Sequence, residues 1–512
     1  MKVDVKSETS IKERNTEIFE SLKIDNLKKY YEEFIKLYGI GSLLQWDNLV
    51  YMPKGNAQYR GEQLAYIEGL MHKMITSKKM GKLLKKAEES KNVNIIDKAI
   101  LRETRKEYDE ETKVPQELVE KLAKARVKGY QTWVKAKKNN DFKSFIDILN
   151  ELIIFKKERA NYINLNIDPY NVMLDHYEPD YTMNDYDRLF KTLKPELIKL
   201  AKSIPENKQD ILKLDYDTNK QFNFTKDILK GFDFNFHLGR QDLTIHPFTI
   251  HSSPTDTRIT TKCVKNWLYI SIFGTIHECG HALYMMNINK ELHNTILYEG
   301  ASYGFHEAQA KLLENIVGKS KDFWIYWYPK LKFHFRKNLK NFSLDDFYLA
   351  INAIKSSLIR IEADEITYNL HIILRYEIEK GLMNGSIDVS ELPDVWSNKM
   401  DYYLDIIPPN DTNGVLQDVH WSEGLFGYFP TYVLGNLYAS QIWNKILNKN
   451  PYIRESIGVG NYIDLFNFLK ENVYQYGRIY KPSDLIEKAT GEKLNSKYFV
   501  DYLKEKFYSI YK

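Results

Sequence analysis

Apolar residues recur every three or four positions through most of the chain, with charged residues between them. The clearest segments are 24–44, 57–84, 94–110, 115–138 and 142–162. This spacing predicts amphipathic helices. The best short-strand candidates are 243–250 and the stretch after Asn413. We therefore expect a mainly α fold, a large helical body around an active-site groove with at most a small β-sheet.

The chain shows no sign of a boundary between independent units. It has no internal repeat, no Gly/Ser-rich linker and no low-complexity tail, and prolines are scattered between the predicted helices. We therefore predict a single domain over residues 1–512.

One short motif carries a specific chemistry. His277, Glu278 and His281 lie in a His-Glu-Cys-Gly-His stretch inside the nearly all-round apolar segment 264–287, which predicts a buried helix. Histidines four apart are about 40° apart around a helix axis, so both imidazoles can reach one metal ion. Glu278 lies beside them as a general base for a water molecule. The motif predicts a zincin-like metal helix, and two core or solvated histidines are the bland alternative.

A catalytic zinc site of this kind needs a third protein ligand. The candidates downstream are His293, Glu299, His306, Glu307 and Glu314. Glu307 begins a second helical run about 25 residues after the motif, the place where glutamate-zincins carry their third ligand. Glu307 is the predicted ligand and His306 the alternative.

Composition excludes several other classes of protein. The 73 basic and 69 acidic residues leave a net charge of only +4 without a basic block, so nucleic acid is not an expected partner. Segment 264–287 is long enough to cross a bilayer, but its lysine, histidines, glutamate and asparagines rule that out. The first thirty residues resemble no secretory signal, so we expect a cytoplasmic protein. Cys263 and Cys279 are not expected to form a disulfide framework.

Several short elements, taken in order, extend this picture over nearly the whole chain. They are Trp46-Asp47 with Met52-Pro53, His246-Pro247-Phe248, Asp256-Thr257-Arg258-Ile259-Thr260, His277 to Tyr284, His306-Glu307, Ile359-Arg360 with Ala363-Asp364, Gly414 to Trp421, and Gly427 to Tyr432. In this order they resemble the carboxypeptidase Taq family of metallocarboxypeptidases. Each string is weak alone, and the ordered set is highly specific.

The resemblance implies hydrolysis of the C-terminal peptide bond of peptides, with release of single amino acids. One divalent metal ion per chain, zinc or in its place cobalt, would be held by His277, His281 and Glu307. Glu278 would act as general base. By analogy with related zinc peptidases, Tyr428 or His420 would stabilise the oxyanion.

A carboxypeptidase must also bind the free carboxylate, for which a guanidinium is well suited. The first candidate is Arg360, in the family's Ile-Arg-x-x-Ala-Asp element, and the second is Arg258; an ion pair of Arg360 with Asp364 is the structural alternative. His246 and Gln417 are expected along the far wall of the groove.

The resemblance further implies a homodimer. Two other functions compete with it: a zinc oligopeptidase that cuts peptides internally, and a non-catalytic helical scaffold.

The chain departs from the family's pattern beside the third ligand. Ala308 and Ala310 replace serines and Lys311 replaces an arginine, so a hydroxyl near Glu307 is missing. We expect this loss to alter metal affinity and leave the ligand in place. The interior pair Cys279 and Gly280 is expected to be incidental to catalysis.

Overall fold

The computed structural model is mainly helical, as predicted, with one small sheet. It describes residues 5–91, 93–205 and 210–511, with side chains described from residue 23 onward. No helix in these ranges combines the length and apolar character that a membrane crossing requires.

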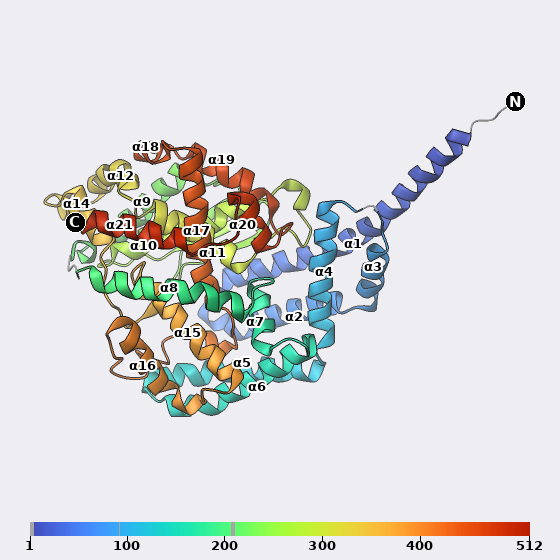
Figure 1. Cartoon of the computed structure of the whole chain (residues 1–512), viewed down its shortest axis with the longest axis horizontal. Helices are drawn as coiled ribbons and strands as arrows, with labels where there is room; N and C mark the ends of the chain where they lie inside the picture. The colour runs from blue at the N-terminus through green and yellow to red at the C-terminus, as the bar shows by residue number, and fades with distance from the viewer. Residues whose placement is uncertain (1–4, 92, 206–209, 512) are drawn as a thin grey trace.

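The N-terminal part forms helices in a sequence close to that predicted. They are α1 (Val5–Val50), α2 (Ala57–Ile75), α3 (Lys78–Glu88), α4 (Ile95–Lys113), α5 (Gln116–Asn139), α6 (Ile146–Ile163), α7 (Pro169–Tyr177), α8 (Met183–Ser203) and α9 (Thr218–Gly231). The single helix expected over 57–84 is wrong, because Ser77 accepts a hydrogen bond from the backbone N–H of Met80 and starts a new helix there. The N-terminal end of α1 extends beyond the rest of the helical body (Figure 1).

The C-terminal part supplies the remaining helices. They are α10 (Leu268–Met286), α11 (Tyr303–Lys311), the π-helix η5 (Leu312–Val317), α12 (Lys321–His334), α13 (Arg336–Leu339), α14 (Leu344–Ile351), α15 (Thr367–Asn384), α16 (Leu392–Leu404), α17 (Pro430–Lys449), α18 (Ile453–Gly458), α19 (Ile463–Asn472), α20 (Pro482–Thr490) and α21 (Lys497–Ile510). Short 3-10 turns, among them η6 (Arg360–Glu362) and η8 (His420–Glu423), connect several of them.

The sheet has three strands in the order β1-β3-β2. β1 (Gly239–Leu243) pairs parallel with β3 (Asp256–Thr261), and β2 (Thr249–Ser253) pairs antiparallel with it. The predicted strand at 243–250 is largely wrong, because most of it connects β1 to β2. The stretch after Asn413 forms turns and η8 instead of a strand.

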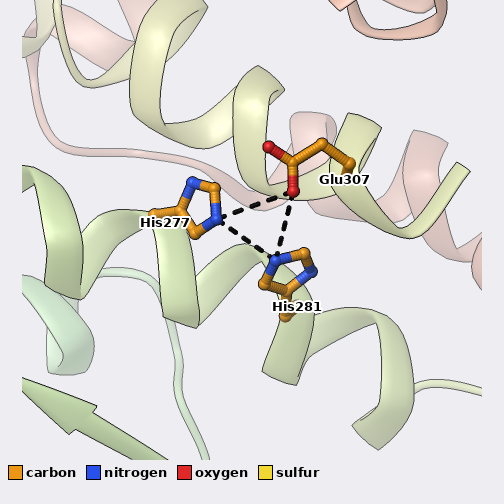
Figure 2. A group of neighbouring side chains, drawn as sticks. All are labelled: His277, His281 and Glu307. Atoms are coloured by element: carbon orange, nitrogen blue, oxygen red, sulfur yellow. Dashed lines mark hydrogen bonds and ion pairs between the residues drawn. The ribbon is translucent and has the colours of Figure 1, made fainter. Parts of the chain in front are cut away.

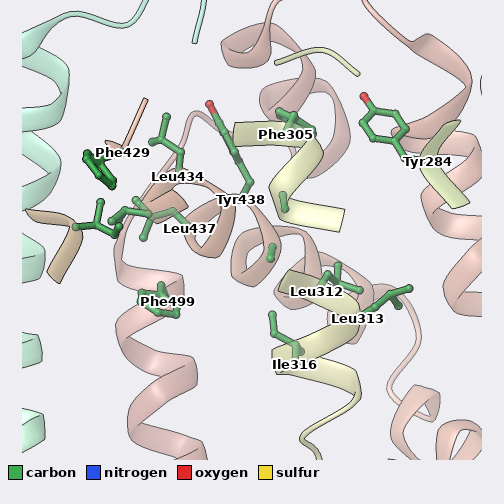
Figure 3. Packing of buried hydrophobic residues seen from close by; sticks show 14 of the residues in the cluster. Tyr284, Phe305, Leu312, Leu313, Ile316, Phe429, Leu434, Leu437, Tyr438 and Phe499 are labelled. Carbon is green, nitrogen blue, oxygen red and sulfur yellow. The ribbon is translucent and has the colours of Figure 1, made fainter. Parts of the chain in front are cut away.

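Most buried apolar side chains belong to one cluster that extends along the chain from Ile24 to Phe507. Around α11 and α17, the rings of Phe305 and Tyr438 pack in a tilted arrangement with their centroids 4.5 Å apart (Figure 3). Aromatic and leucine side chains from η5 and α21 complete this packing. The core therefore fixes α11, the helix that bears Glu307, against α17. The single-domain organisation stays a prediction.

Candidate active site

Two helices bring the three predicted metal ligands together. His277 and His281 lie one turn apart on α10, with their Nε2 atoms 3.2 Å apart. Glu307 on α11 places Oε2 at 3.7 Å from His277 Nε2 and 3.6 Å from His281 Nε2 (Figure 2). Among the described residues, this is the one group of three or more such side chains whose ligand atoms converge closely enough for a metal ion.

A hydrogen bond at Nδ1 of His277 orients its imidazole ring. Its Nδ1 lies 2.9 Å from a carboxylate oxygen of Glu314 in η5. Burial alone would raise the pKa of Glu314, but Lys311, Lys319 and His277 together hold that pKa well below its ordinary value. An ionised Glu314 only accepts hydrogen bonds, so Nδ1 of His277 carries a proton and Nε2 is the nitrogen that faces the other proposed ligands.

His281 is held in the same way by a different partner. Its Nδ1 lies 2.6 Å from Nδ1 of His306. Burial lowers the pKa of His306 to about 4, so this imidazole is neutral and can accept the hydrogen bond. His306 is thus a partner of His281, whereas Glu307 faces the Nε2 atoms of both histidines. Two nitrogen lone pairs and one carboxylate oxygen suit a divalent metal such as zinc.

Glu278 lies in the same cavity as the three ligands. Its side chain is buried, and its Oε2 accepts a hydrogen bond of 2.6 Å from Thr249 Oγ1 on β2. Burial raises the pKa of Glu278. The small sheet therefore orients the predicted general base.

Cys279 and Gly280 were expected to be incidental to catalysis, and Gly280 has a structural role in the site. A Cβ at Gly280 would lie 2.5 Å from the carbonyl oxygen of Gln309 and 2.6 Å from Cα of Ala310. Only glycine allows α10 to approach the backbone of α11 so closely. Gly280 thereby sets the distance between the histidines and Glu307.

A cavity of about 480 Å³ opens in front of the ligands and is lined by Tyr428 among others. His420 lies behind it, with its ring 5.5 Å from that of Tyr428 and its Nε2 3.4 Å from the Tyr432 hydroxyl. Burial raises the pKa of Tyr428 and lowers that of His420 to about 3. Both side chains are therefore neutral hydrogen-bonding groups near pH 7.

Arg360 lies one layer behind the cavity wall and is only 6% exposed. Its Nε and Nη2 donate to Asp418 Oδ1, at 3.0 and 2.9 Å, and its Nη1 donates to the Tyr368 hydroxyl. The guanidinium carbon lies 5.2 Å from the ring centre of Tyr432, which does line the cavity. Asp364 accepts hydrogen bonds from the N–H groups at the start of α15 instead of pairing with Arg360.

The other predicted substrate residues lie outside the cavity lining. Gln417 is buried, and its amide oxygen accepts hydrogen bonds from the Arg360 backbone N–H and from Arg375. Arg258 pairs with Asp256 beside the ring of Trp46. His246 is exposed between β1 and β2.

Two of the cavity-lining residues that the sequence did not single out have a clear polar role. Arg478, from the loop between α19 and α20, reaches it and donates from Nε to the carbonyl of Gly300 at 3.1 Å. Thr249 holds Glu278. Neither stands in a recognisable motif with a metal or a base, so only the tertiary fold reveals them.

Comparison with known proteins agrees with this arrangement. Residues 26–507 match the family model described as carboxypeptidase Taq (M32) metallopeptidase. The chain belongs to this family. It is 38% identical to carboxypeptidase 1 of Bacillus subtilis over 92% of this chain and 95% of that protein. It is 35% identical to thermostable carboxypeptidase 1 of Thermus thermophilus, over 95% and 98% of the two chains.

Solved M32 structures share the fold. The M32 carboxypeptidase of Deinococcus radiodurans superposes with a TM-score of 0.94 at 31% identity, covering 96% of this chain and 99% of that one. The carboxypeptidase of Pyrococcus furiosus gives 0.93 at 31% identity, covering 95% and 99%. The predicted family, helical fold and metallocarboxypeptidase activity are thus confirmed, and a divalent metal is implied.

Proposed function

We propose that His277, His281 and Glu307 hold one zinc ion and that Glu278 is the general base of this metallocarboxypeptidase. The observation that carries the proposal is the convergence of two imidazole Nε2 atoms and a carboxylate oxygen beside a buried glutamate. Held by these three residues, a divalent metal would supply the Lewis acidity that polarises the scissile carbonyl and lowers the pKa of a water molecule. Cobalt has similar ligand preferences, so metal analysis of the purified protein is needed to identify the ion.

Glu278 would move the proton in both halves of the reaction. It takes a proton from the attacking water and passes it to the leaving amine of the C-terminal amino acid. A raised pKa suits both transfers, because a very weak base would accept the proton poorly. The hydrogen bond from Thr249 keeps the carboxylate directed into the cavity.

Tyr428 and His420 would act on the oxyanion. Tyr428 lines the cavity wall. Its raised pKa keeps the hydroxyl protonated, so the hydroxyl can donate a hydrogen bond. His420 lies behind the cavity wall and contacts the hydroxyl of Tyr432, which lines the cavity. It would act through that contact. Hydrogen bonds at such a position typically contribute about 10²- to 10³-fold to kcat.

Arg360 would bind the free carboxylate of the substrate. Asp418 and Tyr368 fix its guanidinium and leave two of its N–H groups unused, so little further ordering is needed on binding. Gln417 would support this position through the Arg360 backbone. Arg478 is the competing candidate because it lines the cavity directly.

The KM of a peptide with a free C-terminal carboxylate separates the two arginines. Arg360→Lys should raise KM for the free-acid peptide, while Arg478→Lys changes its KM little. The reverse pattern would assign the carboxylate to Arg478. Arg258→Lys and His246→Ala serve as matched controls outside the cavity.

Two further properties stay proposals: a homodimeric assembly, which rests on the resemblance alone, and a cytoplasmic location, which is the expectation from the sequence. Sedimentation of the zinc-loaded protein should give twice the mass of one chain. A monomer at micromolar concentration would refute the dimer.

The test of the catalytic assignment is Glu278→Gln. This variant should bind zinc with unchanged stoichiometry but lose at least about 10²-fold in kcat. A variant that retains activity would show that another group moves the proton.

A further inference from the structure

The segment that carries His420 and Tyr428 is attached to a single buried carboxylate. Glu379, on α15, is completely buried. It accepts hydrogen bonds from the Trp421 indole N–H and from the Gly427 backbone N–H, each at 2.8 Å. Trp421 directly follows His420, and Gly427 directly precedes Tyr428. Both candidate oxyanion groups are thus one residue away from a donor to Glu379.

A third donor links the same carboxylate to α7. The hydroxyl of Tyr170, on α7, donates to Glu379 Oε2 at 2.8 Å. The backbone of α7 also abuts the loop, because a Cβ at Gly427 would lie 2.9 Å from the Met173 carbonyl carbon. Gly427 has φ +87°, which a side chain rarely adopts. The loop is therefore clamped between α7 and α15.

Within the described part of the chain, Glu379 is held by hydrogen bonds and not by an ion pair. Among the described residues, no lysine, arginine or histidine nitrogen lies within ion-pair distance of it. Arg375, one turn earlier on α15, donates its hydrogen bonds to Asp418, Gln417 and the His371 carbonyl. Burying a carboxylate is costly, and burial raises its pKa to about 7, although the hydrogen bonds from Gly427, Trp421 and Tyr170 act against this rise. Two of the three donors belong to this loop, and with no ion-pair partner among the described residues the direct polar contacts of Glu379 are these hydrogen bonds.

We infer that Glu379 is a positioning residue for catalysis, which sets the distance of Tyr428 and His420 from the scissile carbonyl. The inference rests on the proposed oxyanion role of these two residues. A glutamine keeps the shape, but its amide nitrogen is a donor and faces a donor in this site. A shift of about 1 Å in a catalytic group can cost about 10²-fold in rate. Glu379→Gln should therefore lower kcat with little loss of substrate binding.

The test measures kcat, KM and zinc affinity of Glu379→Gln in the full-length zinc-loaded enzyme. We expect kcat to fall about 10- to 100-fold, with KM and the zinc Kd within about twofold of the parent. Glu377→Gln is the matched control. Glu377 lies on the same helix, but its partners are Lys194, Lys399 and Tyr403, so its loss should leave kcat unchanged. A Glu379→Gln enzyme with parental kcat, or with kcat and zinc affinity lowered together, would overturn the inference.

Further variants keep the test decisive. If Glu379→Gln does not fold, Trp421→Phe removes only the indole donor and should still lower kcat several-fold; an unchanged kcat there counts against the inference. In a Tyr428→Phe background the Glu379→Gln loss should shrink, because both changes act through one hydroxyl. If Tyr428→Phe and His420→Ala both keep full kcat, the proposed oxyanion roles fail. If they lower kcat and Glu379→Gln does not, only the positioning role fails.

Discussion

His277 donates a hydrogen bond from Nδ1 to the carboxylate of Glu314 at 2.9 Å, and Lys311 lies 3.0 Å from the same carboxylate. This contact orients the imidazole of a proposed metal ligand through the nitrogen that does not face the other two proposed ligands. Partners of this kind fix the tautomer of a ligand and raise its basicity.

Glu314→Gln should therefore weaken zinc binding about 10- to 100-fold. The amide oxygen can still accept one hydrogen bond, but the negative charge that balances Lys311 and Lys319 is lost. Competition with a chelator of known affinity measures the zinc Kd. Glu362→Gln, an exposed carboxylate, is the control, and an unchanged Kd in Glu314→Gln would refute the role.

Two glycines of α10 should respond to alanine in opposite ways. Gly280→Ala forces α10 and α11 apart and should destabilise the protein by about 1–3 kcal/mol, with weaker zinc binding. Gly274→Ala places its Cβ 3.6 Å from Pro247, an ordinary contact, and should stabilise the helix by about 0.5–1 kcal/mol. Thermal unfolding with and without zinc measures both. Equal effects would show that the approach of α11 does not depend on Gly280.

The site shows what the sequence predicts well and what it does not. The spacing of His277 and His281 is a local property of a helix, so the motif alone placed both imidazoles together. Glu307 followed because the third ligand of such sites lies at a characteristic distance along the chain. Gly280, Arg478 and Glu379 depend on which helices meet in space, and a pattern along one chain does not contain that information.

The strand prediction was wrong for a related reason. The central strand β3 spans Asp256–Thr261 and is mostly polar, so its apolar alternation is weak. It is stabilised by pairing with β1 on one side and β2 on the other. The more apolar connection before β2 looked more strand-like. Cross-strand pairing decided the outcome over local propensity.

Stability should depend on pH through Glu178. This buried carboxylate accepts hydrogen bonds from Ser302 and Gly304 at the start of α11 and from Tyr438. Burial raises its pKa to about 7, whereas an unfolded glutamate titrates near ~4.3. Between these values the folded state binds more protons than the unfolded state, so this contribution to stability is present below about pH 4 and is lost as pH rises to 7.

Denaturant unfolding of the metal-free protein from pH 5 to 8 tests this sign. Relative to Glu178→Gln, the parent should lose about 2 kcal/mol over this range. Removing the metal is necessary because metal binding has its own pH dependence. Parallel stability curves for the two proteins would contradict the raised pKa.

This site should remove amino acids one at a time from a free C-terminus. One synthetic peptide, digested as the free acid and as the C-terminal amide, with and without chelator, tests it directly by timed mass spectrometry. We expect a ladder of products shortened by single residues from the free acid, no loss from the amide, and no ladder with chelator. Internal fragments from both forms, or a ladder that survives metal removal, would contradict it.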